Sequence, residues 1–249
     1  MKYIKCFVAV LFCLILFVNM IITSSAVNTG FSVKPKPKED ADNFISNIGI
    51  VFLTEEPTKK AIDNFAVNSE GMIAIAQTKT NVATVCVYSD EGAFQYGYTF
   101  HCEGSFYVEW DENNVNIFFV RSDNIITLDS EGALLDIAEV ENTKDNNSYV
   151  NNVLLKSKYT VGDKEYSIKN NMGPLSLLAF SYSQVVVTDS NGESRIIYDV
   201  NSLQFIKTIL IIVGVGTFAF VCIFGVIKQL EKEAERQRAA KKTDDRSLS

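Results

Sequence analysis

The sequence predicts an all-β domain that is attached to a membrane by one C-terminal transmembrane α-helix. Between residues 44 and 204, short apolar runs alternate with turns rich in Asn, Asp and Gly, which is the pattern of strands and hairpins. Residues 208–227 are apolar throughout. The chain also has 47% hydrophobic residues, too many for a disordered protein. We therefore expect residues 44–204 to form one domain with its own core.

Residues 208–227 are predicted to span the membrane. They read TILIIVGVGTFAFVCIFGVI, twenty residues without a charge, between Lys207 and Lys228. At a rise of about 1.5 Å per residue, such a helix matches a hydrocarbon core of about 30 Å. A core helix of a soluble protein is rarely apolar on every face over this length, so we interpret the segment as a transmembrane helix.

Residues 1–26 have the three parts of a secretory signal. Lys2 and Lys5 form a charged start, and an apolar stretch runs from residue 6 to residue 22. Ser24 and Ala26 then supply small residues at the −3 and −1 positions, which predicts cleavage after Ala26. The alternative is an uncleaved signal anchor, with which the chain would cross the membrane twice.

Basic residues at both ends predict the orientation in the membrane. Lys2 and Lys5 precede the first apolar segment, and residues 228–249 carry seven Lys and Arg against five acids. Basic flanks mark the cytoplasmic side of a membrane segment. We therefore expect a basic, helical cytoplasmic tail and a domain on the outer side of the cell membrane.

The predicted domain is acidic. Residues 27–207 carry fourteen Lys and Arg against twenty-five Asp and Glu, a net charge of about −11. This balance argues against a nucleic-acid partner, because phosphate binding needs Lys and Arg. It also predicts that the domain as a whole avoids anionic lipid and attracts cations or basic partners.

Residues 27–43 are predicted to be an extended linker. The run from Lys34 to Lys38 alternates Lys with Pro, which favours extended and solvated chain. We expect a spacer between the membrane and a domain that begins near Phe44.

The domain sequence repeats a pattern of four strands. In the first copy (residues 62–100) we expect strands at 64–67, 72–77, 83–88 and 93–100, and the second copy occupies residues 105–140. The turn sequences SDEGAF and DSEGAL place Gly92 and Gly132 forty residues apart. Asp, Asn and Ser cap such turns, and Gly takes the positive φ. A looser third copy covers residues 149–200, with an inserted hairpin at 159–168.

Four strands per period of about forty residues resemble the blades of a β-propeller. The resemblance covers residues 62–200 and implies about three four-stranded units, arranged as a partial propeller, as a ring shared by two chains, or as a sandwich. A strand at residues 47–53 would close the ring by pairing the two ends of the domain. The overall layout also resembles uncharacterised membrane proteins of low-GC Gram-positive bacteria.

The sequence predicts no catalytic residue, no metal site and no cofactor. His101 is the only histidine, which excludes a His-based triad or a multi-His zinc site within one chain. The motifs GxSxG, HExxH, CxxC and the P-loop do not occur. The acidic turns lack the ligand spacing of a calcium loop, so we interpret their side chains as turn caps.

Cys86 and Cys102 are predicted to be free, buried thiols. If residues 89–92 turn a hairpin, the two positions lie several residues apart along the strand ladder, further than a disulfide can reach. A disulfide would need a different strand register.

Aromatic residues are dense at 94–100 and 106–110. On alternating strand positions, half of them should pack in the core. The others, Tyr96, Tyr98 and Tyr107, are candidates for an exposed patch that binds a protein or a glycan. Core packing is the competing interpretation for all three.

We expect a membrane-anchored binding or interaction module, not an enzyme, with a protein or another envelope component as its partner. The first alternative is a structural or accessory subunit of a cell-envelope membrane complex, which would use the span and tail as its interaction surface. The second alternative is an envelope hydrolase, which would need an acidic cleft.

Overall fold

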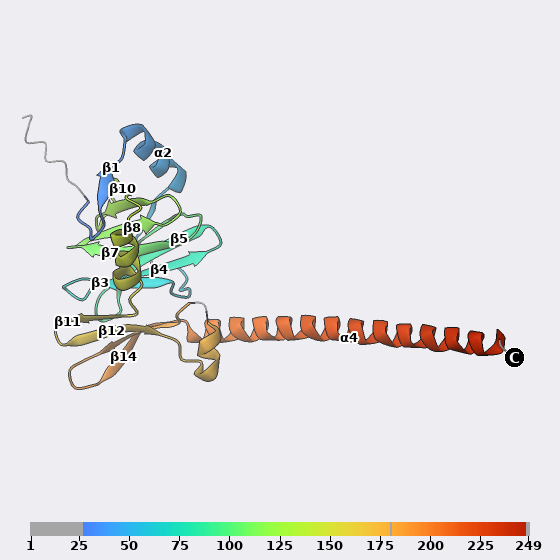
Figure 1. The fold of residues 1–249 in the computed structure, drawn as a ribbon. Coiled ribbons are helices and arrows are strands. Elements are labelled where there is room, and N and C mark those ends of the chain that lie inside the picture. Colours follow the sequence, from blue (N-terminus) through green and yellow to red (C-terminus); the bar gives the residue numbers. More distant parts are fainter. Residues whose placement is uncertain (1–26, 180, 248–249) are drawn as a thin grey trace, which may run out of the picture.

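The computed structural model describes residues 27–179 and 181–247, with side chains up to residue 233; the predicted signal at 1–26 lies outside these residues. The chain forms three open antiparallel β-sheets that precede one long helix, α4 (Asn201–Ser247). Figure 1 shows the sheets stacked on one another, with α4 leaving from the end of the third. The domain is thus mostly β, as predicted, with short helices added.

Each sheet is built on a meander of four consecutive strands. The first sheet has the order β2-β6-β5-β4-β3, the second β1-β10-β9-β8-β7, and the third β11-β12-β13-β14. The strand bounds are as follows: β1 Val33–Pro35, β2 Val51–Leu53, β3 Asn64–Val67, β4 Ile73–Lys79, β5 Val82–Tyr88, β6 Phe94–His101, β7 Phe106–Asp111, β8 Asn114–Phe119, β9 Asn124–Leu128, β10 Leu134–Val140, β11 Lys158–Val161, β12 Lys164–Lys169, β13 Gln184–Thr188 and β14 Ser194–Asp199.

Four of the hairpin turns have the predicted chemistry, with side-chain caps from Asn68, Ser89, Asp129 and Asp189. In the turn between β9 and β10, the Asp129 side chain accepts the backbone N–H groups of Glu131 and Ala133 at 2.9 and 2.8 Å. Asp189 does the same in the turn between β13 and β14. Gly132 and Gly192 close these turns at φ of 86° and 82°, where glycine is strongly favoured. The acidic turns are therefore capped hairpins.

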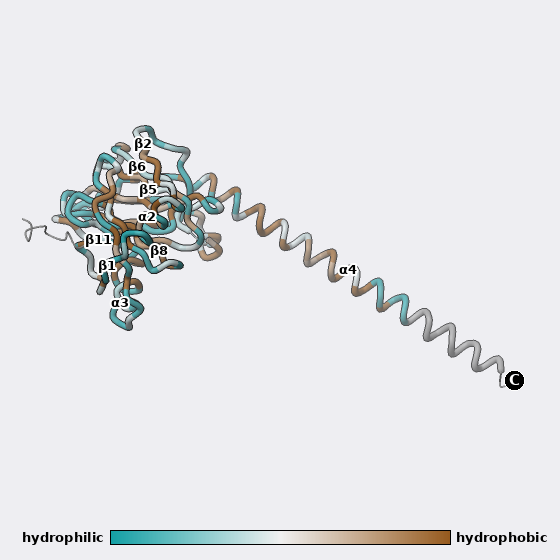
Figure 2. The backbone as a smooth tube through the Cα atoms, turned by 90° about the horizontal axis from the view of Figure 1, so that it is seen from above, coloured by the Kyte–Doolittle hydropathy of each residue, from teal (hydrophilic) through white to brown (hydrophobic). Residues whose placement is uncertain are grey.

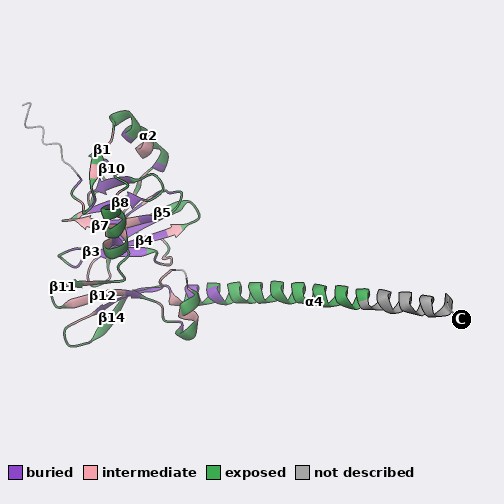
Figure 3. Cartoon of the chain, viewed as in Figure 1, coloured by how far each residue is buried: buried purple, intermediate pink, exposed green. Residues whose placement is uncertain are grey.

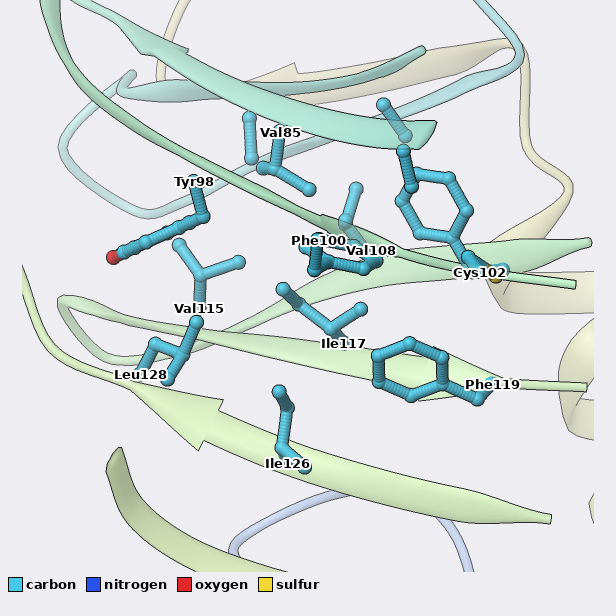
Figure 4. Close-up of a cluster of buried hydrophobic side chains, with 14 of the residues drawn as sticks. Val85, Tyr98, Phe100, Cys102, Val108, Val115, Ile117, Phe119, Ile126 and Leu128 are labelled. Atoms are coloured by element: carbon cyan, nitrogen blue, oxygen red, sulfur yellow. The ribbon is translucent and has the colours of Figure 1, made fainter. Parts of the chain in front are cut away.

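The first sheet lies between the other two and is buried on both faces. One face packs on the second sheet in a cluster that includes Val85, Phe100, Val115 and Ile117 (Figure 4). The other face packs on the third sheet through residues such as Ile73 and Tyr198. The strands β3, β4 and β5 are accordingly almost wholly buried (Figure 3). Their near-continuous apolar runs suit this position better than alternation would.

Buried polar side chains join the sheets. Asn64 on β3 donates to the Phe106 carbonyl at 2.8 Å and accepts the Val108 N–H at 3.1 Å, linking the first sheet to the second. Tyr198 on β14 donates its hydroxyl hydrogen to the Lys60 carbonyl at 2.7 Å, which links the third sheet to the loop before β3. These bonds fix which sheet edges meet.

The prediction of an extended linker at residues 27–43 is wrong, because this segment packs on the domain. Val27 and Phe31 are buried against the outer face of the second sheet, and β1 pairs with β10. The helix α2 (Lys38–Ile48) then begins directly after Pro37. The apolar side chains before Lys34 find a partner surface, so the Lys-Pro run forms a sheet edge and not a spacer.

The expected ring closure through residues 47–53 is also wrong. Asn47 and Ile48 end α2, Gly49 caps it, and only β2 is extended. β2 pairs with β6 inside the first sheet, with Phe52 opposite Tyr98. The strand therefore forms an edge of the first sheet and does not pair with the third sheet.

The hairpin at 159–168 is not an insertion. It supplies β11 and β12, the first two strands of the third sheet. The inserted segments are helical: α3 (Lys144–Tyr149) with η1 (Val150–Leu154) before β11, and η2 (Gly173–Leu178) between β12 and β13. These segments account for the longer spacing from Gly132 to Gly192.

Among the residues that the structure describes, one helix is long and apolar enough to cross a membrane: Asn201–Glu233, the first part of α4. Its most apolar stretch has no buried residue. Figure 2 shows the hydrophobic stretch of α4 standing clear of the domain, followed by hydrophilic residues. The predicted membrane anchor is present as a helix, and the same helix continues through the basic tail to Ser247.

Candidate binding cleft

A cleft of about 580 Å³ opens between α2, the loop from β6 to β7, and the loop from β8 to β9. Its lining combines aromatic, aliphatic, charged and thiol side chains. The cleft lies over the junction of the first and second sheets, because β6 belongs to one and β8 to the other. Concave sites with an apolar floor and a few polar groups are typical of ligand binding.

The amphipathic sequence of α2 places its apolar side over this junction. Ala41, Phe44, Ile45 and Ile48 follow the helical spacing i, i+3, i+4, i+7, and all four are partly or fully buried. The Phe44 ring meets the Phe119 ring edge-on, with 5.1 Å between centroids. These aromatic contacts form the floor of the cleft.

The rim of the cleft carries charge. Arg121 Nη1 lies 2.8 Å from Glu103 Oε2, and His101 Nε2 lies 3.8 Å from Glu103 Oε1. The three side chains are 73%, 57% and 49% exposed for Arg121, Glu103 and His101. Exposed ion pairs contribute little to stability, so these groups can exchange partners when a ligand arrives.

Cys102 lies at the inner end of the cleft but is not poised as a nucleophile. It is buried, and its thiol donates to the Gly104 carbonyl at 3.6 Å. Burial raises its pKa, so the thiol stays protonated at neutral pH. Among residues 27–179 and 181–247, no group of His, Cys, Asp and Glu side chains could hold a metal ion.

A second polar cluster surrounds the buried carboxylate of Glu109 on β7. It accepts hydrogen bonds from the Thr29 hydroxyl, from Asn116 Nδ2 at 3.1 Å and from the Tyr149 hydroxyl at 2.7 Å. Burial and the Glu109 carboxylate raise the pKa of Tyr149, which keeps this donor protonated. The cluster fastens residues 27–31 and α3 to the second sheet, and its carboxylate is fully engaged.

The three tyrosines expected to form one patch are not all brought together. Tyr98 is fully buried, and its hydroxyl donates to the Asp129 carbonyl. Tyr96 packs beside it in the same cluster, with ring centroids 5.7 Å apart. Tyr107 lies on the opposite face of the second sheet, stacked on Phe118. The competing interpretation, core packing, is correct for Tyr98.

Both cysteines predicted to be free are free and buried. Cys86 lies opposite Gly97 in the ladder between β5 and β6, and Cys102 follows the end of β6. Burial, the largest cause, raises the pKa of Cys86 to about 12.

In comparisons with protein-family models and with curated proteins, nothing matches this chain. The interpretation of the cleft therefore rests on its geometry.

The cleft was not predicted, although its elements have sequence signals. The helical spacing of apolar residues at 41, 44, 45 and 48 marks α2 within the expected linker and first strand. By contrast, nothing in the spacing of Glu103 and Arg121 indicates that they pair, because the contact depends on how two loops from neighbouring hairpins meet.

Proposed function

We propose that this protein is a membrane-anchored binding module whose domain lies outside the cytoplasm. The C-terminal helix supplies the anchor. The lysines before the first apolar segment and the basic tail after the span support an outward orientation of the domain. The bound partner is a protein or another component of the cell envelope.

The cleft beside α2 is the observation that carries this proposal. It combines the aromatic floor of Phe44 and Phe119 with the exposed charges of Glu103 and Arg121. In Figure 1, α2 lies at the opposite end of the stack of sheets from α4, so the cleft and the membrane anchor are separate parts of the molecule. Such a combination suits a partner that inserts an apolar side chain and places polar groups on the rim.

Binding is favoured over catalysis by the state of the reactive side chains. Cys102 is a protonated, buried thiol, and the Glu109 carboxylate is held by three hydrogen-bond donors. A nucleophile or general base would need to be deprotonated and free to reach a substrate. We infer that the cleft recognises a partner without transforming it.

We further propose that the three sheets are propeller-like units. The first strands of the three meanders support this, because β3 contacts both β7 and β11. Innermost strands that meet near an axis are expected of blades. The arrangement with the first unit in the middle fits a partial propeller better than a two-layer sandwich.

Site-specific photo-crosslinking tests the binding function. A photoreactive amino acid at Ser122, on the rim, should give a discrete adduct in intact cells. The same residue at Leu135, exposed on β10 and outside the cleft, is the control and should give none. Adding Glu103→Lys to the Ser122 probe should weaken the adduct by reversing a rim charge. Equal labelling from both positions, or none from either, contradicts the proposal.

The accessory-subunit alternative is favoured by the bare surface of α4, which stands free of the domain along its apolar length. Exchanging residues 208–249 for an unrelated membrane anchor separates the two functions. If the crosslink at Ser122 and the cellular function survive the exchange, the domain carries the function. If the function is lost while the crosslink remains, the span and tail carry it.

A further inference from the structure

A second pocket, of about 320 Å³, lies at the base of α4. It is formed by the loop before β3, the end of β4 and the first two turns of α4. Four lysines line it, Lys59, Lys60, Lys79 and Lys207. This lysine pocket is therefore basic, although the domain as a whole is acidic.

The four lysines are only partly neutralised. Lys59 pairs with Glu56 at 3.3 Å and lies over the Tyr198 ring, 5.1 Å from its centroid. Asp63 lies near enough to Lys207 for their charges to interact. Among the described side chains, the ion pairs do not include Lys60, Lys79 or Lys207. The pocket therefore keeps excess positive charge that can receive an anion.

Apolar side chains are exposed beside this pocket. The short helix η2 packs against α4, visible in Figure 1 as the gold helix next to the first turns of α4. Its Leu177 is 91% exposed and its Leu178 is 55% exposed. On α4 itself, Leu203 lines the pocket and is 60% exposed. Leucines that are this exposed and close together mark a surface that contacts a membrane or another protein.

The position of this surface along α4 indicates that it contacts the membrane. Lys207 immediately precedes the apolar segment 208–227, and Leu203 lies one turn earlier. The interfacial region of a bilayer extends about 5–8 Å beyond the hydrocarbon core, which is four or five residues of helix. Thr208 and Gln204 are nevertheless buried, and Gln204 Nε2 donates to Ser181 Oγ at 3.0 Å, just past η2. The domain therefore reaches the level at which the membrane begins.

We propose that the lysine pocket and η2 together form a lipid-binding surface of the domain. The phosphate of an anionic phospholipid headgroup binds Lys60, Lys79 and Lys207, and Leu177 and Leu178 enter the boundary between headgroups and acyl chains. Lysine stems can lie along apolar surface while their ammonium groups meet phosphate. This contact holds the domain against the bilayer.

Membrane depth of η2 is the first test. The full chain is reconstituted in lipid nanodiscs with a spin label on Leu177→Cys, and the control label is on Leu135→Cys, an exposed leucine of β10. The label at Leu177 should be relaxed more strongly by oxygen than by a water-soluble nickel chelate, and the label at Leu135 should show the reverse. Equal preference for the water-soluble reagent at both positions overturns the membrane contact of η2.

Headgroup binding is the second test. Amide hydrogen exchange at residues 58–61 and 78–82 is compared in nanodiscs of phosphatidylcholine alone and with phosphatidylglycerol. Exchange should slow several-fold with phosphatidylglycerol. Replacing Lys60, Lys79 and Lys207 by Gln should abolish the effect, whereas the same change at Lys38, Lys144 and Lys156, which lie exposed elsewhere on the domain, should preserve it.

Two results overturn the headgroup assignment. The first is equal exchange in both lipid compositions. The second is full protection by inorganic phosphate added to the detergent-solubilised chain, because it would show that the pocket takes a free anion and needs no lipid.

Discussion

Gly132 and Gly192 offer a controlled measurement of how tightly the first two sheets pack. They occupy equivalent positions in two turns with the same capping bonds and nearly the same φ, 86° and 82°. A Cβ added at Gly192 meets nothing within 4 Å. A Cβ added at Gly132 would lie 2.7 Å from Phe52 Cδ2 and 2.9 Å from Phe52 Cβ. The pair therefore separates backbone strain from steric contact.

The expected costs differ by a factor of two or more. Alanine at positive φ costs about 1 kcal/mol of unfolding free energy, which is the whole effect expected for Gly192→Ala. Gly132→Ala must also displace Phe52 and with it β2, which adds about 1–3 kcal/mol, the usual cost of overpacking. For a domain of this size these values correspond to a fall in Tm of about 2–4 °C at Gly192 and about 4–16 °C at Gly132.

Thermal unfolding of the full chain in detergent, followed by circular dichroism of the β-sheet signal, gives both Tm values. Gly132→Ala combined with Phe52→Ala is the control: the smaller side chain removes the ring contacts but keeps the Phe52 Cβ 2.9 Å from the added Cβ, so the added effect of Gly132→Ala should shrink and stay above that of Gly192→Ala. Equal Tm values for the two single variants would refute the reasoning, since they would show that β2 does not hold Phe52 against the turn.

Three further predictions concern the Asn64 side chain, the Cys86 thiol and the amino terminus. Asn64→Ala should lower Tm by at least about 4 °C, because it leaves the Phe106 carbonyl and the Val108 N–H unpaired at about 1–3 kcal/mol each. Asn152→Ala, on an exposed residue with a local bond, should change Tm little. With its pKa raised to about 12, Cys86 should not react with a thiol reagent at pH 8 until the domain unfolds, and rapid reaction in the folded state would contradict its burial. Signal cleavage after Ala26 should leave Val27 as the amino terminus, with its ammonium beside the Asp136 carboxylate that accepts its backbone N–H; N-terminal sequencing of the membrane form tests this, and a retained signal refutes it.

The strands and turns could be predicted from the sequence because their signals are local. The first strand of the first meander, β3 (Asn64–Val67), was predicted with its bounds unchanged, and the turn glycines were placed by the Asp, Asn and Ser residues that cap them. The free state of Cys86 and Cys102 followed from strand spacing alone. Each of these predictions depends on residues within one hairpin.

The errors concern contacts between distant segments. Alternation along β6 placed Tyr96 and Tyr98 on one face but could not show that the second sheet covers that face. The Lys-Pro run looked solvated because the apolar residues that hold it, Val27 and Phe31, bind a surface built a hundred residues later. The cleft depends on the same kind of contact, so of its parts only α2 has a readable sequence pattern.

The net negative charge of the domain gave no indication of the basic pocket at the base of α4. Residues 27–207 predict repulsion from anionic lipid, but Lys60, Lys79 and Lys207 come together only through the fold. Net charge describes the field far from a protein, whereas a headgroup meets the few residues within a Debye length of about 8–10 Å.

The orientation of the domain is the claim on which the proposed function depends, and cysteine accessibility tests it most directly. The native Cys86 and Cys102 are buried, so the probe must be a new cysteine in an exposed turn, Ser190→Cys, with Thr243→Cys in the tail for comparison. A membrane-impermeant maleimide applied to intact cells should label position 190 at once and position 243 only after permeabilisation. Labelling of position 243 but not position 190 in intact cells would place the domain in the cytoplasm and contradict the account.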